Sequence, residues 1–219
     1  YRWPPACPTG SMLSAAYRSA ELGWRVSSCI SGMRSTGSGA MSYPRRRCAG
    51  GVPARTLRTM LHPDIDVLAP LLGTWAGAGA GEYPTIDDFA YLETISFAHV
   101  GKPFLAYTQR TRHPDTGAPM HSETGYWRVP APGRLEIVMA QPTGLTEIYE
   151  GDILERDGIV VMDVRSPVVG ATSTAKEVTV TERTFGLDGD ELRYTFRMAA
   201  VGQPLQHHLA ATLRRTDDG

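Results

Sequence analysis

Histidines are the side chains of this sequence with the strongest capacity to bind a metal or a cofactor. All six lie after residue 60, whereas all three cysteines lie before it. His207 and His208 are adjacent, and His121 is far from them along the chain. The sequence contains no His-x-His or His-Glu-x-x-His pattern, so it gives no indication of a zinc site. The elements that carry the histidines decide which of them can act.

The adjacent pair lies in the last run of apolar and β-branched residues, which is typical of a strand. Neighbouring strand residues point to opposite faces, so only one of the two imidazoles can enter the interior. His207 shares a face with Leu209 and Leu213, and His208 shares the other with Ala210. Alternation leaves the choice open, and the alternative that both are ordinary strand histidines without a ligand role stays open with it.

Ten runs rich in Val, Ile, Thr, Tyr and Phe follow residue 72, separated by Gly, Pro and Asp turn signals. This is the pattern of an antiparallel meander, because the turn residues suit tight hairpins. Apolar residues at helical spacing predict a short helix before the first run. We expect this helix over 64–72 and strands near 73–82, 89–100, 103–112, 121–129, 134–141, 146–154, 159–165, 175–185, 192–200 and 205–215.

A long twisted antiparallel sheet without covering helices closes on itself, because closure removes its exposed edges. We therefore predict an all-β fold, a ten-stranded antiparallel up-and-down β-barrel of the lipocalin or fatty-acid-binding type with a short leading helix. At roughly ten strands the interior exceeds what side chains fill, which predicts a cavity for one ligand. A flattened β-sandwich without such a cavity is the structural alternative.

The first expected strand contains Gly73, Trp75, Gly77 and Gly79 in a Gly-x-Trp-x-Gly-x-Gly pattern. Glycine permits bending and close backbone approach, and we expect Trp75 to pack at the closed end of the barrel. A phosphate-binding loop is not indicated, since no lysine or helix start follows at a suitable position. The hydroxyl side chains also lack the nucleophile-elbow pattern of serine hydrolases.

The first sixty residues differ in composition from the rest of the chain. They contain nine arginines, no lysine and one acidic residue, whereas the remainder contains 13 basic and 22 acidic residues. Their Gly, Ser and Pro content and lack of period predict a disordered basic extension over residues 1–60, followed by the barrel domain over 61–216. An inert extension, or a reading frame begun upstream of a true start at Met41 or Met60, is favoured over a targeting or nucleic-acid arm.

The charge and hydropathy of the whole chain exclude several classes of partner. The net charge is -1, which does not favour nucleic acid as a partner. No apolar stretch has the length needed to span a bilayer, so we expect no membrane partner. An odd number of cysteines confined to the extension indicates a reducing compartment, and we expect a soluble cytoplasmic protein.

Six motifs occur in order along residues 61–215. They are the Gly73–Gly79 pattern, Tyr83-Pro-Thr-Ile86, Phe97-Ala-His-Val-Gly-Lys-Pro-Phe104, His121-Ser-Glu-Thr-Gly-Tyr126, Ala175-Lys-Glu177 and Pro204-Leu-Gln-His-His-Leu-Ala210. Together they resemble the nitrobindins, a family of small heme-binding β-barrels. Lipocalin-like barrels also begin with Gly-x-Trp, so the ordered set carries the resemblance. The first sixty residues have no counterpart in the family pattern.

The resemblance implies the residues that hold the cofactor, heme b. It places the axial histidine immediately before the Leu of Pro-Leu-x-x-His-Leu, which is His208, and it leaves His207 at a variable position. Thr85 and His121 match positions that line the heme pocket. Lys176 matches a basic residue suited to pairing with a heme propionate.

The resemblance also implies an activity, the heme-dependent isomerisation of peroxynitrite to nitrate, together with binding of nitric oxide. The expected partners are therefore these small molecules, and a homodimer is compatible with the sequence. Two alternatives stay open: a non-catalytic heme protein that senses or carries nitric oxide, and a carrier of fatty acids or other lipids that uses the same cavity.

Overall fold

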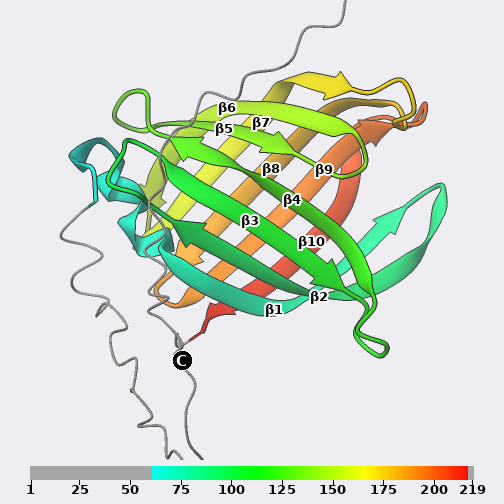
Figure 1. The fold of residues 1–219 in the computed structure, drawn as a ribbon, viewed down its shortest axis with the longest axis horizontal. Coiled ribbons are helices and arrows are strands. Elements are labelled where there is room, and N and C mark those ends of the chain that lie inside the picture. Colours follow the sequence, from blue (N-terminus) through cyan, green and yellow to red (C-terminus); the bar gives the residue numbers. More distant parts are fainter. Residues whose placement is uncertain (1–60, 217–219) are drawn as a thin grey trace, which may run out of the picture. The chain divides into compact units, whose positions relative to one another are not determined.

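The computed structural model describes residues 61–216. The predictions for residues 1–60 lie outside the described residues. Within them the chain forms one 3-10 helix and ten strands (Figure 1). The bounds are η1 Pro63–Leu71, β1 Gly73–Tyr83, β2 Ile86–Ala98, β3 Leu105–Arg112, β4 Pro119–Arg128, β5 Arg134–Ala140, β6 Leu145–Arg156, β7 Ile159–Ala171, β8 Val178–Asp188, β9 Glu191–Ala200 and β10 Gln206–Arg215.

The ten strands form one closed antiparallel barrel in which each strand pairs with its neighbours in the sequence. Closure occurs between β1 and β10, which pair in register from Trp75 with Arg215 to Gly81 with Leu209. No crossover interrupts the order, so the predicted up-and-down barrel is confirmed and the β-sandwich alternative is wrong. Closure leaves every strand of the described barrel paired on both sides.

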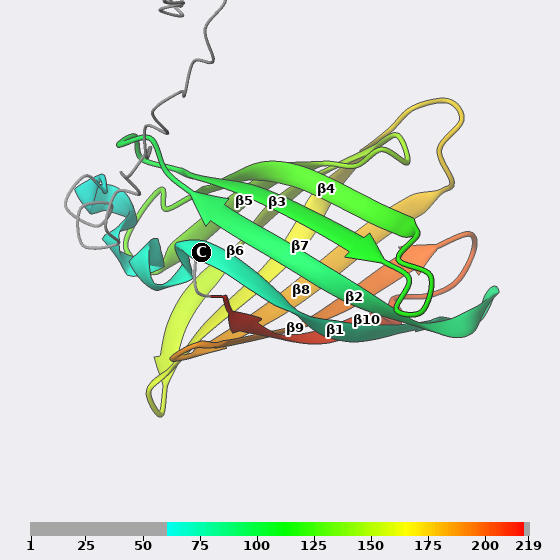
Figure 2. The ribbon, with the colours of Figure 1, turned by 60° about the horizontal axis from the view of Figure 1, so that its bottom comes forward.

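The helix η1 closes one end of the barrel (Figure 2). Its apolar residues Ile65, Leu68 and Leu71 are buried. The indole Nε1 of Trp75 donates a hydrogen bond to the Leu71 carbonyl at 2.8 Å, and the Arg215 guanidinium lies 4.2 Å from the centroid of the indole ring. These contacts fix the helix to the two strands at which the barrel closes. The predicted short helix is confirmed, and it is a 3-10 helix, a tighter geometry that Pro70 inside the segment favours.

The glycines of β1 allow neighbouring groups to approach the backbone closely. A Cβ at Gly77 would overlap the Thr212 carbonyl on β10, and a Cβ at Gly79 would overlap the Tyr91 ring. Only glycine leaves room for these contacts. The tightly wound wall at β1 therefore depends on the absence of side chains at these two positions.

Aromatic side chains fill the closed half of the barrel. Trp127 is fully buried and meets Phe97 and Phe185 edge-on, with ring centroids 5.1 Å and 5.0 Å apart. Tyr107 lies against the same indole at 5.7 Å. Such edge-to-face packing stabilises a dense core. The cavity is therefore confined to the other half of the barrel, where the β1–β2 turn and the loops after β7 and β9 lie.

Several strand boundaries differ from the sequence prediction; the largest difference is at the end of β7, and the others are at most three residues. β7 continues to Ala171, although the sequence predicted its end near residue 165. Its pairing with β8 stops at Ser166, whereas its pairing with β6 continues to Ala171. Pro167 has no amide N–H to donate, and because it lies beyond the pairing with β8 it interrupts no hydrogen bond of that pairing. β8 in turn begins at Val178, so the segment that carries Lys176 is a loop and not the start of a strand.

Within residues 61–216 no helix has the length and apolarity needed to cross a membrane.

Candidate functional site

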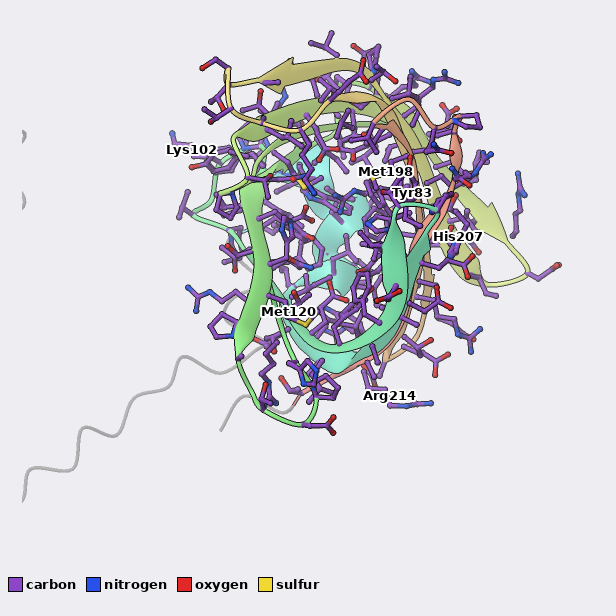
Figure 3. The ribbon with its side chains drawn as sticks, turned by 90° about the vertical axis from the view of Figure 1, so that its right-hand side faces the viewer. Tyr83, Lys102, Met120, Met198, His207 and Arg214 are labelled. Carbon is purple, nitrogen blue, oxygen red and sulfur yellow. The ribbon has the colours of Figure 1, made fainter. Side chains whose placement is uncertain are left out.

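A cavity of about 580 Å³ opens at the end of the barrel opposite η1. Figure 3 looks into this end, with Tyr83, Met120 and Met198 near the rim. Much of its wall is apolar, and the apolar lining includes Ile86, Phe89, Leu145, Val178, Phe196, Met198 and Leu209. Cavities of this size and character accept ligands with a large apolar surface.

A β-bulge in β10 decides which of the adjacent histidines reaches the cavity. In the register with β9, His207 pairs with Arg197 and Leu209 pairs with Phe196, so His208 is the extra residue. His208 and Leu209 consequently both line the cavity, whereas His207 is exposed on the outer side (Figure 3). Uninterrupted alternation from Leu209 would have turned His207 inward. The bulge reverses that outcome.

The His208 ring is held in one orientation and one tautomer. Its Nδ1 lies 2.9 Å from the Glu82 carbonyl, which can only accept, so Nδ1 carries the proton and Nε2 keeps its lone pair. The rings of Tyr83, Phe89 and Phe196 surround it at 5.3, 6.2 and 5.9 Å. Burial lowers the pKa of His208, although the bond to the Glu82 carbonyl opposes this. The side chain is thus a neutral imidazole with a free ligand nitrogen.

The other three predicted pocket residues also line the cavity. Thr85 lies in the two-residue turn between β1 and β2, and Lys176 lies in the loop before β8, both exposed. His121 lies near the start of β4, with Nε2 4.0 Å from the Glu123 carboxylate. Burial lowers the pKa of His121, although the Glu123 charge raises it. The cavity lining thus contains Lys176 at the mouth and a second imidazole, His121, in the wall, in addition to His208.

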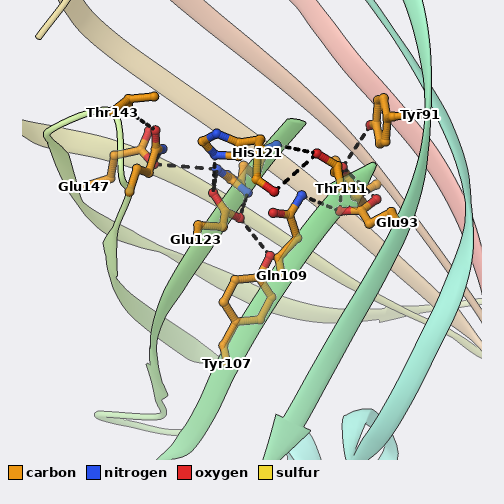
Figure 4. Close-up of polar contacts among 12 residues, drawn as sticks. Tyr91, Glu93, Tyr107, Gln109, Thr111, His121, Glu123, Thr143 and Glu147 are labelled. Atoms are coloured by element: carbon orange, nitrogen blue, oxygen red, sulfur yellow. Dashed lines mark hydrogen bonds and ion pairs between the residues drawn. The ribbon is translucent and has the colours of Figure 1, made fainter. Parts of the chain in front are cut away.

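The floor of the cavity is a buried ionic network that the sequence analysis missed (Figure 4). Arg183 donates two hydrogen bonds to the Glu123 carboxylate at 2.7 and 2.8 Å and one to the Tyr149 hydroxyl at 3.0 Å. The Glu147 carboxylate lies 3.6 Å from the same guanidinium. Burial alone would raise the pKa of Glu123, but the charge and hydrogen bonds of Arg183 outweigh it and hold the pKa below its ordinary value.

A second buried carboxylate, Glu93, lies beside this network. It accepts hydrogen bonds from the Gln109 amide at 2.8 Å and from the Tyr194 hydroxyl at 3.0 Å. The Tyr194 hydroxyl is in turn 3.0 Å from that of Tyr91. Burial raises the pKa of Glu93 to about 7, although the bonds from Gln109 and Tyr194 oppose the rise. The surroundings of Glu93 therefore favour its protonated form more than water does.

A signal for the network was present in the sequence. Three alternate residues of β2 are buried, namely Tyr91, Glu93 and Ile95. The carboxylate of Glu93 therefore lies on the inward face of the strand. Glu123 and Arg183 likewise occupy inward phases of β4 and β8. Charged residues in an apolar phase predict buried pairs. Their partners could not be assigned, because Arg183 and Glu123 are 60 residues apart.

The cavity fits a heme group by its donor set and its lining. A heme requires one strong axial nitrogen, apolar contact for its ring and a cation near its propionates. His208 supplies a neutral imidazole, the rings of Phe89 and Phe196 adjoin it, and Lys176 lies in the lining at the exposed mouth. The residues present are therefore compatible with this cofactor.

Curated relatives share most of the barrel sequence. The chain is 59% identical over 155 residues to peroxynitrite isomerase 2 of Mycobacterium marinum, a match that covers 71% of this chain and 96% of that protein. It is 59% identical to the peroxynitrite isomerase of Nocardia farcinica, with 71% and 92% covered. The shared region corresponds in length to the described barrel.

A solved structure and a family model agree with these relatives. The crystal structure of Rv2717c from Mycobacterium tuberculosis is similar with a TM-score of 0.70 and 52% identity, covering 72% of this chain and 99% of that one. Residues 64–215 match the model described as the THAP4-like heme-binding beta-barrel domain. The chain therefore belongs to the THAP4-like, or nitrobindin, family of heme-binding β-barrels.

Proposed function

We propose that this chain is a heme-dependent peroxynitrite isomerase, which converts peroxynitrite to nitrate and also binds nitric oxide. The observation that carries the proposal is the β-bulge that turns His208 into an apolar cavity with its Nε2 lone pair free. The family match and the names of the curated relatives support the same activity.

In this proposal His208 would hold the heme iron through its Nε2 lone pair. Thr85 and His121 would line its binding site, and the exposed Lys176 would supply a cation suited to a propionate. The cofactor is heme b, because residues 61–216 contain no cysteine for a thioether bond. We further propose a cytoplasmic protein whose functional unit is residues 61–216 and which forms homodimers.

When bound, the heme iron supplies the Lewis acidity and redox chemistry for the rearrangement of peroxynitrite. The chain contributes position and environment. Glu82 fixes the ring orientation of His208 through the bond to Nδ1, which also raises the basicity of Nε2. The apolar wall excludes water, and His121 with Gln109 offers polar groups to a small ligand.

The lipid-carrier alternative is less well supported by the cavity floor. A free buried cation would stabilise a fatty-acid carboxylate, and among the described residues the buried cation in the cavity lining is Arg183. Its guanidinium is already bound through two hydrogen bonds to Glu123 and contacts Glu147. A fatty-acid carboxylate would have to displace a buried carboxylate that is fixed to the barrel.

The experiment that tests the proposal is a heme titration of three proteins followed by peroxynitrite decay. Wild type should give a Soret band and an increased yield of nitrate. His208→Ala should lose both, whereas His207→Ala, its exposed neighbour, should retain them. If His207→Ala abolishes the Soret band and His208→Ala retains it, the ligand assignment is wrong. A heme-loaded protein without effect on peroxynitrite decay would instead favour the sensor alternative.

A further inference from the structure

The barrel wall has a weak point between β4 and the β5–β6 hairpin. β4 begins at Pro119, but its pairing with β5 covers only Thr124 to Arg128, because β5 ends at Ala140. The first half of β4 therefore has no strand partner on this side. The hairpin turn of residues 141–144 lies next to it in place of a strand.

A second cavity of about 380 Å³ occupies this position. Its outer part is formed by residues that point away from the barrel interior, including Thr108, Arg110, Thr124 and Ala140. Its inner part contains Gln109, Glu123 and Gln141, and these three residues also line the main cavity. These three residues thus separate the two cavities.

The barrier between the two cavities consists of polar side chains that belong to different elements. Gln141 donates a hydrogen bond to Glu147 at 2.7 Å and accepts one from Thr143 at 3.1 Å. The Oε1 atom of Gln109 is buried and has no hydrogen-bond partner among the described residues. Buried acceptors of this kind ordinarily bond to water, so Gln109 Oε1 is an acceptor available to a small molecule between the two cavities.

We propose that this opening is a lateral port through which small uncharged ligands of the heme, such as nitric oxide or carbon monoxide, enter and leave the cavity. The charges define the class of molecule that passes. The inner end carries the carboxylates of Glu123 and Glu147 with one cation, Arg183, and Glu93 lies nearby, so anions are disfavoured. The proposal rests on the heme binding proposed above, and it adds a second route into the cavity besides the open mouth.

The port can be closed from outside without changing a residue that touches the cofactor. Thr124 and Thr195 are both exposed threonines on the outer face of central strand segments, and only Thr124 lines the port. Thr124→Trp places an indole over the opening, whereas Thr195→Trp places the same indole on β9. Ser122→Trp, from the adjacent part of β4, serves as an independent second closure. Gln141→Ala removes the side chain that spans the inner end.

The experiment is laser flash photolysis of the carbon monoxide complex of each heme-loaded ferrous protein, with the bimolecular rebinding rate as readout. We expect Thr124→Trp and Ser122→Trp to lower this rate severalfold, Gln141→Ala to raise it, and Thr195→Trp to match wild type. If both closing variants rebind carbon monoxide at the wild-type rate while their Soret bands are intact, the port is refuted and the proposed function stands. If wild type takes up no heme, the proposed function is refuted and the port proposal falls with it.

Discussion

Replacement of Arg183 by methionine tests whether the buried network of the cavity floor stabilises the barrel. Arg183 is 7% exposed, and the Glu123 and Glu147 side chains that it joins are 2% and 1% exposed. Arg183→Met leaves both carboxylates in place without their cation. Glu123 then keeps one hydrogen bond, from Tyr107 at 2.8 Å, and Glu147 keeps those from Tyr149 and Gln141 at 2.9 and 2.7 Å.

The expected loss follows from the cost of an uncompensated buried charge. Removal of one partner from a buried ion pair destabilises a protein by about 3–5 kcal/mol, which is a large part of the roughly 5–15 kcal/mol that stabilises a domain. We expect a loss of this size near pH 7, measured by urea unfolding of the heme-free protein. The double variant Arg183→Met/Glu123→Leu should be more stable than the single one, because it removes one of the two stranded charges.

The pH dependence separates this explanation from a simple loss of packing. In wild type, Arg183 holds the pKa of Glu123 below its ordinary value, so Glu123 contributes stability above its unfolded pKa and loses it as the pH falls through the lowered folded value. In the Arg183→Met variant no cation opposes the effect of burial, so the pKa of Glu123 is raised. The stability of the variant therefore falls as the pH rises and Glu123 ionises. The deficit should therefore be smaller near pH 5 than near pH 7. Equal deficits at both values, or a loss below about 1 kcal/mol, would refute the argument.

Two further variants address the neighbouring carboxylate and the first strand. Because the folded pKa of Glu93 is raised to about 7, its contribution to stability is fully present below the unfolded pKa and is lost as the pH rises through 7, a change of roughly 3 kcal/mol that Glu93→Gln should abolish in unfolding curves. Gly77→Ala should cost roughly 2–4 kcal/mol because its Cβ would overlap the Thr212 carbonyl. Gly186→Ala, where the nearest atom to a Cβ is Ile159 Cγ2 at 4.0 Å, should be nearly neutral in the same thermal melts.

The sequence was sufficient to predict the barrel because its strands alternate cleanly. β5 shows the pattern in its shortest form, with Leu135, Ile137 and Met139 buried and the residues between them more exposed. Turn residues with positive φ, such as Gly133, Gly144 and Gly158, occur at the hairpins that the sequence suggested. Local pattern and turn chemistry therefore agree with the closed sheet, and such agreement between levels is what makes a fold predictable.

The boundary errors arose where pairing on the two sides of a strand ends at different residues. The sequence predicted that β7 ends near residue 165, yet only the β8 side of the strand stops there, just before Pro167. The proline can be read from the sequence, but the offset between neighbouring strands of the barrel cannot. Stagger depends on closure, a property of all ten strands, and no local window records it.

The choice between His207 and His208 shows the limit of alternation most clearly. Counted outward from the buried residues Leu213 and Ala211, an unbroken strand directs His207 inward, and the residue chemistry of the two candidates is identical. The bulge that directs His208 inward contains no glycine and has no local signature. Only the ordered motifs of the family predicted the outcome, and neither spacing nor propensity could have replaced them.

One side chain, Arg183, connects the buried ionic network at the cavity floor with the aromatic residues beside His208. The Arg183 guanidinium lies 4.6 Å from the centroid of the Phe196 ring, and that ring lies 5.9 Å from the imidazole of His208. Arg183 thus joins the buried carboxylates below the cavity to the aromatic wall that orients the proposed axial ligand. The network also lies between the aromatic packing of the closed half and the cavity. The polar residues that appear costly for folding therefore maintain a cavity which a fully apolar interior would tend to fill.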